Sequence, residues 1–343
     1  MTVRKPTIVD VAKISGVSPV TVSRVIANSG AVRERTRKAV LDAMVSLNYP
    51  LPPFTEPAAM PHYIAILIDD IFNQHYLSLA LDISDSLYAA GYLSLICRSN
   101  SRSINDYLKL YPDNASGFIA ISLLGEQAEA ISAACAAGIP LVAIHRCPMF
   151  SSAHSIIADD YSNAYLAMEH LVSLGHTDIA IINHPQYSAG VHEAVMGYRD
   201  AVACFGAVDD DNYIFYSNME QKDAESIFSY IRAMYPQVTA IICANESVAQ
   251  AITDSAVSVG LSVPQDISII TFDISTDVSA KLGHCCFTAV GAPYSLFAEE
   301  AVKTILRFID RPREFLNGEN SFYRVILKSK LFIGYSTAAA KRR

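Results

Sequence analysis

The sequence contains no tryptophan, and only 17% of its 343 residues are charged. It also lacks any unbroken run of about 18 apolar residues, which a membrane-spanning helix would need, and no apolar segment of the kind found in signal peptides follows Met1. The seven cysteines form no CxxC pair and have no metal-ligand spacing, so we interpret them as buried thiols in a reducing compartment. These absences exclude membrane proteins and secreted disulfide-rich scaffolds. With 51% apolar residues, the chain is expected to be a cytoplasmic α/β protein of two or three domains.

Signatures of common enzymes are missing as well. The sequence has no GxSxG, GxxxxGK, GxGxxG or HExxH motif. Two pairs of carboxylates, Asp69–Asp70 and Asp159–Asp160, could act in acid–base chemistry. Each pair follows an apolar run, however, where such residues more often cap a helix or bind a ligand. His170 and His176 have an unlikely metal-ligand spacing, and we predict no catalytic residue, cofactor or metal.

The charge is unevenly distributed along the chain. Residues 1–49 hold eight Lys and Arg side chains against three acidic ones, whereas the other 294 residues carry a net charge of −13. A small basic segment attached to an acidic body suggests that the segment contacts a polyanion and the body does not.

The basic segment has the pattern of short helices. Thr7 and Asp10 have the spacing of a capping box, and Ile8, Val11, Ala12 and Ile14 form the apolar positions of the helix that follows. Gly16 permits a tight turn after this helix.

A second helix is expected from Ser18, which can cap it, with Pro19 at its first position. Its inward residues are Val22, Val25 and Ile26, and a third helix is predicted from about Glu34 to Leu47. Two helices joined by a glycine-containing turn and supported by a third predict a helix-turn-helix, which places its second helix in the DNA major groove. The alternative is a small three-helix cap without a DNA partner.

The rest of the chain alternates between strands and helices, which is typical of parallel sheets covered on both faces. The expected strands lie at 63–68, 93–96, 118–121, 141–144, 179–182, 213–216, 240–243 and 267–272. The expected helices lie at about 75–90, 125–137, 161–174, 193–205, 223–235, 245–259 and 295–309. Periodicity alone permits either one large sheet or two lobes.

Residues 7–26, TIVDVAKISGVSPVTVSRVI, closely resemble the DNA-binding head of the lactose-repressor (LacI/GalR) family of bacterial transcription regulators. Similar landmarks follow in family order, among them His170–His176, Gly197–Arg199 and Gly260–Ile270. The resemblance implies an α/β fold with an N-terminal three-helix helix-turn-helix DNA-binding head (1–49), a linker (50–61) and a two-lobed, doubly wound body (62–343) like that of periplasmic binding proteins. The first lobe would hold about 62–160 and 291–322, and the second about 161–290 and 323–343.

The resemblance also implies DNA-contacting residues. Pro19, Val20 and Arg24 occupy the positions that read base edges, and Arg24 can donate two hydrogen bonds to one guanine. Hydroxyl groups suited to phosphate contacts or to positioning the head come from the following residues. These are Thr7, Ser18, Thr21, Ser23 and Thr36.

Two regions depart from the family pattern. The linker has five prolines in twelve residues, so the short hinge helix that is usual there is expected to be absent. In the ligand cleft, Ala194 replaces a usual Arg and His145 a usual Asp, which puts a plain sugar effector in doubt and leaves a different small metabolite, or no effector, as alternatives. By position, the candidate effector contacts are Asn73, Arg146, Asn245 and Asp273, and for each of them a structural role, such as capping the following helix, is the alternative.

The predicted function is therefore a transcription regulator, a repressor, that binds a near-palindromic operator in double-stranded DNA as a homodimer. A carbohydrate-like small molecule or related metabolite between the lobes would act as its effector. The alternative from another class is a small-molecule binding protein, or a degenerate enzyme, with a vestigial DNA-binding head.

Overall fold

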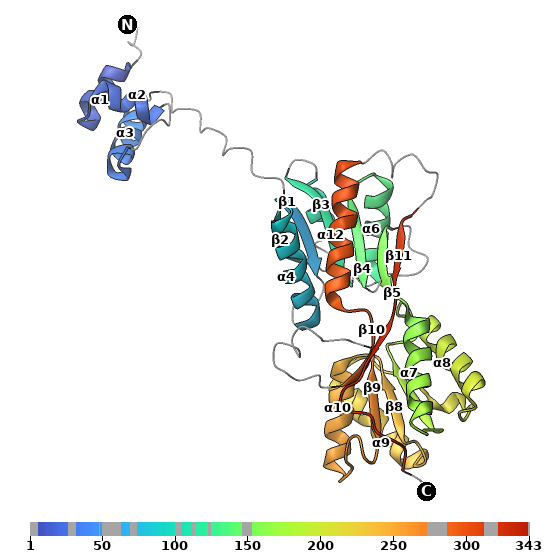
Figure 1. Ribbon diagram of the computed structural model, residues 1–343. Helices are drawn as coiled ribbons and strands as arrows, with labels where there is room; N and C mark the ends of the chain where they lie inside the picture. The colour runs from blue at the N-terminus through green and yellow to red at the C-terminus, as the bar shows by residue number, and fades with distance from the viewer. Residues whose placement is uncertain are drawn as a thin grey trace. The chain divides into compact units, whose positions relative to one another are not determined.

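A computed structural model of the chain describes residues 6–26, 32–47, 49, 63–68, 74–99, 104–111, 114–122, 125–145, 153–272, 287–311 and 322–341. The chain divides into two compact units, Met1–Pro61 and His62–Arg343 (Figure 1). The prediction that the proline-rich linker 50–61 lacks a hinge helix falls outside the described residues.

The first unit contains three helices, α1 (Ile8–Ser15), α2 (Pro19–Ile26) and α3 (Glu34–Ser46). Their shared core is made of residues that are at most 5% exposed, and it confirms the predicted inward face of α2. These residues are Val11, Ala12, Val22, Val25, Val40, Ala43 and Met44. The placement of Ile14 on the packed face was wrong, since its side chain is 56% exposed. It lies two residues after Ala12, and at 3.6 residues per turn this directs it away from the core.

The ends of these helices are fixed by the capping residues that the sequence indicated. The Asp10 carboxylate accepts hydrogen bonds from the Thr7 backbone N–H and from the Thr7 hydroxyl, both at 2.7 Å. Gly16 ends α1 with a left-handed φ of 68°, which costs a glycine little. The Ser18 hydroxyl oxygen then accepts the Thr21 backbone N–H at 3.1 Å and so caps α2.

The second unit begins with a six-stranded parallel sheet in the order β11-β5-β4-β3-β1-β2. Its strands are β1 (Tyr63–Ile68), β2 (Leu93–Arg98), β3 (Ala115–Ile121), β4 (Leu141–His145), β5 (Ser155–Ala158) and β11 (Arg324–Leu327). The helices of this lobe are α4 (Gln74–Ala89), α5 (Ile104–Leu108), α6 (Gly125–Ala136) and α12 (Tyr294–Asp310). α4 and α12 pack on one face of the sheet and α6 on the other (Figure 1), where α5 packs as well.

A second six-stranded sheet has the order β12-β10-β9-β8-β6-β7 and is parallel except where β12 pairs with β10. Its strands are β6 (Ile179–Asn183), β7 (Ile214–Tyr216), β8 (Ala240–Cys243), β9 (Ser268–Thr271), β10 (Thr288–Gly291) and β12 (Lys330–Phe332). The helices are α7 (Asp160–Ser173), α8 (Val191–Phe205), α9 (Gln221–Met234), α10 (Glu246–Ser258) and the short turn η1 (Asp211–Tyr213). α7 and α8 cover one face and α9 and α10 the other. The chain therefore forms two lobes, the arrangement that the resemblance implied.

The chain crosses between the two sheets three times. The crossings lie at Asp159, at 292–293 and at 328–329. The last one falls after β11 rather than near residue 322 as expected, because Arg324–Leu327 pairs with β5 in the first sheet. At this crossing the Ser329 hydroxyl donates to the Asn163 side-chain oxygen at 2.6 Å and contacts the Asp159 carbonyl oxygen at 3.2 Å.

Among the described residues, no helix is long and apolar enough to span a membrane. The same part of the chain contains no cluster of His, Cys, Asp and Glu side chains that could hold a metal ion.

Two histidines, the buried His176 and the half-buried His170, bind the C-terminal segment to the second lobe. His176 is 3% exposed, and its Nε2 lies 3.0 Å from the Ala338 carbonyl oxygen. A carbonyl oxygen only accepts, so Nε2 carries the proton and Nδ1 accepts from the Thr239 hydroxyl at 2.8 Å. His170 Nε2 lies 3.0 Å from the Thr337 hydroxyl. Burial lowers the pKa of His176 and of His170 below their ordinary value.

This arrangement predicts that the free energy of unfolding falls as the pH drops from 7.5 to 5.5. Below the unfolded-state pKa of about 6.5, the unfolded chain binds a proton that buried His176 resists, so acid favours unfolding. We expect His176→Gln to lose stability at pH 7.5 but to show a smaller loss between the two pH values than the unsubstituted chain. Urea unfolding at both pH values measures this difference. His192→Gln, which replaces an exposed histidine on α8, is the control, and an unchanged pH dependence in His176→Gln would contradict the assignment.

Candidate functional site

The outward face of α2 carries the residues predicted to read DNA bases. Val22 and Val25 are buried against α1 and α3, and this fixes the rotation of α2 about its axis. Pro19, Val20 and Arg24 are consequently exposed, Val20 to 61%. Within the described part of the chain, the Arg24 guanidinium has no hydrogen bond or ion pair, so all its donors can reach a ligand.

The predicted hydroxyl residues divide into two groups. The Ser18 and Thr21 hydroxyls lie 2.8 Å from each other at the start of α2, and that of Thr7 is bonded to Asp10. These three side chains have a structural role in the head. Ser23 is exposed beside Arg24, and Thr36 is half-buried in the first turn of α3. Of the hydroxyl residues, Ser23 therefore has the best placement for an external contact.

The unit that carries this helix face also exposes several other cations. The exposed cations of the unit include Lys13 on α1, Arg33 before α3, and Arg35 and Lys38 within α3. Asp10, one of the three acidic residues, is occupied by the cap of α1. A protruding helix with one uncommitted arginine in a basic surrounding has the shape and charge to enter the DNA major groove.

Of the four predicted effector contacts, only Asn245 lies within the described residues, and Asn73, Arg146 and Asp273 lie outside them. Asn245 caps α10 through its side-chain oxygen, which accepts the Val248 N–H at 2.9 Å. Its side-chain nitrogen lies 3.1 Å from the Met219 sulfur. This is the structural role that the sequence left open as an alternative to a ligand contact.

The carboxyl edge of the first sheet contains a group of rings that sequence reasoning did not assemble. The His145 ring, at the end of β4, lies 5.7 Å from that of Tyr294, 5.4 Å from that of Tyr76 and 5.6 Å from that of Phe297. The ring of His75, in the first turn of α4, stacks on Tyr294 at 5.8 Å. These residues come from two helices, α4 and α12, and from a strand end that are distant in sequence, and only His145 was noticed, as a departure from the family pattern.

The two lobes touch at this edge. His75 Nε2 lies 3.5 Å from a carboxylate oxygen of Glu246, which begins α10 in the second lobe. On the second lobe, Asn183 ends β6 and is 2% exposed, and its amide nitrogen has no hydrogen-bond partner among the described residues. One Glu193 carboxylate oxygen is likewise buried and unpaired there. Buried polar atoms without partners are costly unless a ligand or water satisfies them.

Ala194 is 3% exposed and packs in the core beside α7. The position at which the family pattern has an Arg therefore supplies no cation to a ligand. Together, these residues offer aromatic faces, amide and carboxylate groups, and imidazoles at the facing edges of the two sheets.

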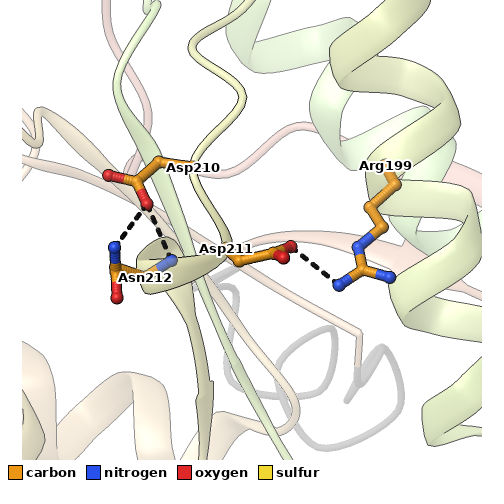
Figure 2. Close-up of polar contacts among 4 residues, drawn as sticks. All are labelled: Arg199, Asp210, Asp211 and Asn212. Carbon is orange, nitrogen blue, oxygen red and sulfur yellow. Dashed lines mark hydrogen bonds and ion pairs between the residues drawn. The ribbon is translucent and has the colours of Figure 1, made fainter.

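Acidic residues of the second unit are engaged in structural bonds. Asp159 caps α7 by accepting the Ser162 N–H at 3.0 Å and the Ser162 hydroxyl at 2.7 Å. In the acidic run after α8, Asp210 accepts the backbone and side-chain N–H groups of Asn212, and Asp211 accepts Arg199 at 2.7 Å, as Figure 2 shows. Asp159 thus has the capping role that the sequence favoured, whereas Asp69–Asp70 falls outside the described residues.

Residues 7–50 match the family described as bacterial regulatory proteins, lacI family. Residues 76–282 match the family described as periplasmic binding proteins and sugar binding domain of LacI family. The second match alone extends over more than half of the chain, and the two together take in both compact units.

Proteins similar to this chain match it over most of its length. The HTH-type transcriptional regulator DegA of Bacillus subtilis is 28% identical, over 97% of this chain and 98% of its own length. The HTH-type transcriptional repressor PurR of Vibrio campbellii is 29% identical, over 78% and 81%. Among solved structures, the lac repressor dimer bound to operator and the anti-inducer ONPF has a TM-score of 0.68 at 22% identity, over 98% of this chain and all of that one. The CelR–cellobiose complex has a TM-score of 0.65 at 23% identity, over 96% and 99%.

Proposed function

Because the chain belongs to the LacI family of bacterial regulatory proteins, we propose that it is a sequence-specific DNA-binding transcription repressor whose operator affinity is controlled by a small molecule. Residues 1–49 form the DNA-binding unit, 50–61 the linker and 62–343 the regulatory body. The observation that carries this proposal is the exposed face of α2, where Arg24 lies uncommitted in a basic surrounding. Two repressors and one regulator among the similar proteins support it.

In this proposal α2 enters the major groove with Pro19, Val20 and Arg24 toward the base edges. Arg24 donates to O6 and N7 of a guanine, and Val20 contacts a thymine methyl group. Ser23 contacts a phosphate, which fixes position without specifying sequence. Thr7, Ser18 and Thr21 fix the starts of α1 and α2, and Thr36, in the first turn of α3, remains a candidate for a phosphate contact.

The effector lies between the two lobes, at the facing carboxyl edges of the sheets. Asn73, Arg146, Asn245 and Asp273 remain our candidate contacts, and Asn245 would have to act while it caps α10. The ring group around His145 and the unpaired atoms of Asn183 and Glu193 extend this set. CelR was solved with cellobiose, and we propose a carbohydrate-like or related metabolite here.

We further propose that the repressor is a homodimer that binds a near-palindromic site, since a single small head would hold DNA weakly. An apolar face on the first lobe fits this role. Leu81 and Tyr88 on α4 are 52% and 75% exposed, and Leu95 on the neighbouring edge strand β2 is 44% exposed. Contiguous exposed apolar side chains mark protein interfaces.

No catalytic function is proposed, because the named relatives are regulators and Asp159, in the carboxylate pair that the structure describes, serves as a helix cap. We propose a cytoplasmic location, since a regulator of bacterial genes acts where the DNA lies.

Fluorescence anisotropy with the full chain and genomic DNA fragments tests the proposal. We expect selective binding to a subset of fragments, with an affinity that falls steeply as the salt concentration is doubled, because bound phosphates release counterions. Sedimentation equilibrium of the complex should give two chains per site. Equal binding to all fragments, or binding insensitive to salt, would contradict the proposal.

A further inference from the structure

A pocket of about 500 Å³ lies where two of the three lobe crossings meet, beside the first two turns of α7. One side is formed by Asp159 and by residues of α7, and the other by Lys328 and Ser329 of the last crossing. The volume is within the range of about 300–1,000 Å³ found for small-molecule sites. Among the described residues, the lining of this pocket does not include Asn245, the predicted effector contact that the structure describes.

Most of the polar groups that line this pocket are already engaged. Both oxygens of the Asp159 carboxylate accept hydrogen bonds from Ser162, one from its N–H and one from its hydroxyl. The Ser329 hydroxyl donates to Asn163 at 2.6 Å. These hydrogen bonds hold the Asp159 and Ser329 side chains in place as part of the pocket wall, where their oxygens can still accept hydrogen bonds but neither group offers a free donor.

The apolar part of the lining consists of Leu166 and two tyrosine rings. The rings of Tyr161 and Tyr165 lie 6.2 Å apart and are tilted by only 15° from parallel. Their hydroxyls donate to groups on α8, that of Tyr161 to Asp200 at 2.9 Å and that of Tyr165 to the Cys204 sulfur at 3.3 Å. The two tyrosines therefore present mainly the carbon surface of their rings to the pocket.

Lys328 is the exception among the lining groups. Its side chain is exposed, and within the described residues its ammonium group has neither a hydrogen bond nor an ion pair. The pocket thus combines one cation that has no bonding partner among the described residues with an aromatic and aliphatic wall. These two features indicate which kind of ligand would be complementary. Such a ligand has a compact apolar body and a single negative charge.

We propose that this pocket is a second small-molecule site, which binds an aromatic monocarboxylate with its carboxylate on Lys328 and its ring against Tyr161, Tyr165 and Leu166. A ligand held there touches both the crossing at Asp159 and the crossing at 328–329. The bound ligand would therefore hold two of the three connections between the lobes close to each other. This would restrain the movement of the two lobes relative to each other from a site outside the effector site.

Equilibrium dialysis of phenylacetate against the full chain tests the site. We expect saturable binding of one phenylacetate per chain. Lys328→Met should weaken it by about tenfold or more, whereas Lys330→Met, which removes an exposed lysine two residues further on, should change it by less than about twofold. Leu166→Trp should abolish binding by filling the pocket. Glu246→Gln, in the proposed effector site, should leave phenylacetate binding unchanged, so a failure of the effector assignment is separable from a failure here.

Two further probes test separately how much the negative charge and the aromatic ring contribute to binding. 2-Phenylethanol keeps the ring without the charge, and acetate keeps the charge without the ring, and both should bind at least about tenfold more weakly than phenylacetate. The proposal is overturned by any of three results. These are no saturable binding of phenylacetate, equal affinity in Lys328→Met, and equal affinity for either of the two partial probes.

Discussion

Arg24→Ala is expected to relax the preference for one base pair in each half of the DNA site while leaving the fold of the head intact. A bidentate arginine–guanine contact contributes about 1–3 kcal/mol of discrimination, which is roughly a 5- to 150-fold preference. The structure indicates that the substitution would remove this contact without disturbing the fold of the head. The side chain is exposed and makes no bond within the described residues, whereas Val22 and Val25 on the opposite face hold α2 in place.

Selection of binding sites from a random library, with the full chain and each variant, measures this preference. Ser23→Ala is the matched control, since it truncates the neighbouring exposed residue. A lost phosphate contact should weaken binding to all sequences alike and leave the selected motif unchanged. If Arg24→Ala selects the same motif with the same strength at every position, the role assigned to Arg24 is wrong.

The head was predictable in detail because its determinants are local. A capping residue, a glycine turn and apolar positions three and four residues apart all act within one or two helical turns, and Asp10, Gly16 and Ser18 take the predicted roles. Ile14 was assigned to the packed face because it is apolar, without regard to its angular position around the helix. An apolar residue near the end of a short helix need not lie on the packed face.

The lobes show where local patterns stop being sufficient. Seven of the predicted helices and eight of the predicted strands are present, but β5, β10, β11 and β12 were not anticipated. Each of these strands has only three or four residues and depends on a distant partner, as β11 does on β5. A short apolar run does not indicate which of the two sheets it will join. For this reason the last crossing between the lobes was predicted too early in the sequence.

The candidate ligand residues are limited in the same way. That Asn245 follows a strand was evident from the sequence, but the sequence could not decide between a cap and a ligand contact. The stacking of His75 and His145 on Tyr294 joins residues up to 219 positions apart, and the contact of His75 with Glu246 joins two lobes. Such juxtapositions are products of topology, and no spacing along the chain encodes them.

Gly197→Ala is expected to destabilise the second unit by about 3 kcal/mol, although the same substitution in an exposed helix is favourable by about 0.5–1 kcal/mol. Gly197 lies in α8 at its closest approach to α7. An added Cβ would overlap the carbonyl oxygen of Tyr161 and would lie 2.9 Å from its carbonyl carbon and 3.1 Å from its Cα. These are backbone atoms, so relief requires the two helices to move apart rather than a side chain to rotate.

Urea unfolding compares Gly197→Ala with Met196→Ala, which changes a side chain that is 46% exposed at the adjacent position of α8. We expect the unfolding midpoint to fall markedly for Gly197→Ala and to change little for Met196→Ala. Separation of the helices would also displace Tyr161, whose hydroxyl reaches Asp200 on α8 and whose ring lines the phenylacetate pocket. Phenylacetate affinity should therefore fall in those Gly197→Ala molecules that remain folded. A variant as stable as the unsubstituted chain would show that α7 and α8 are not in backbone contact at this glycine.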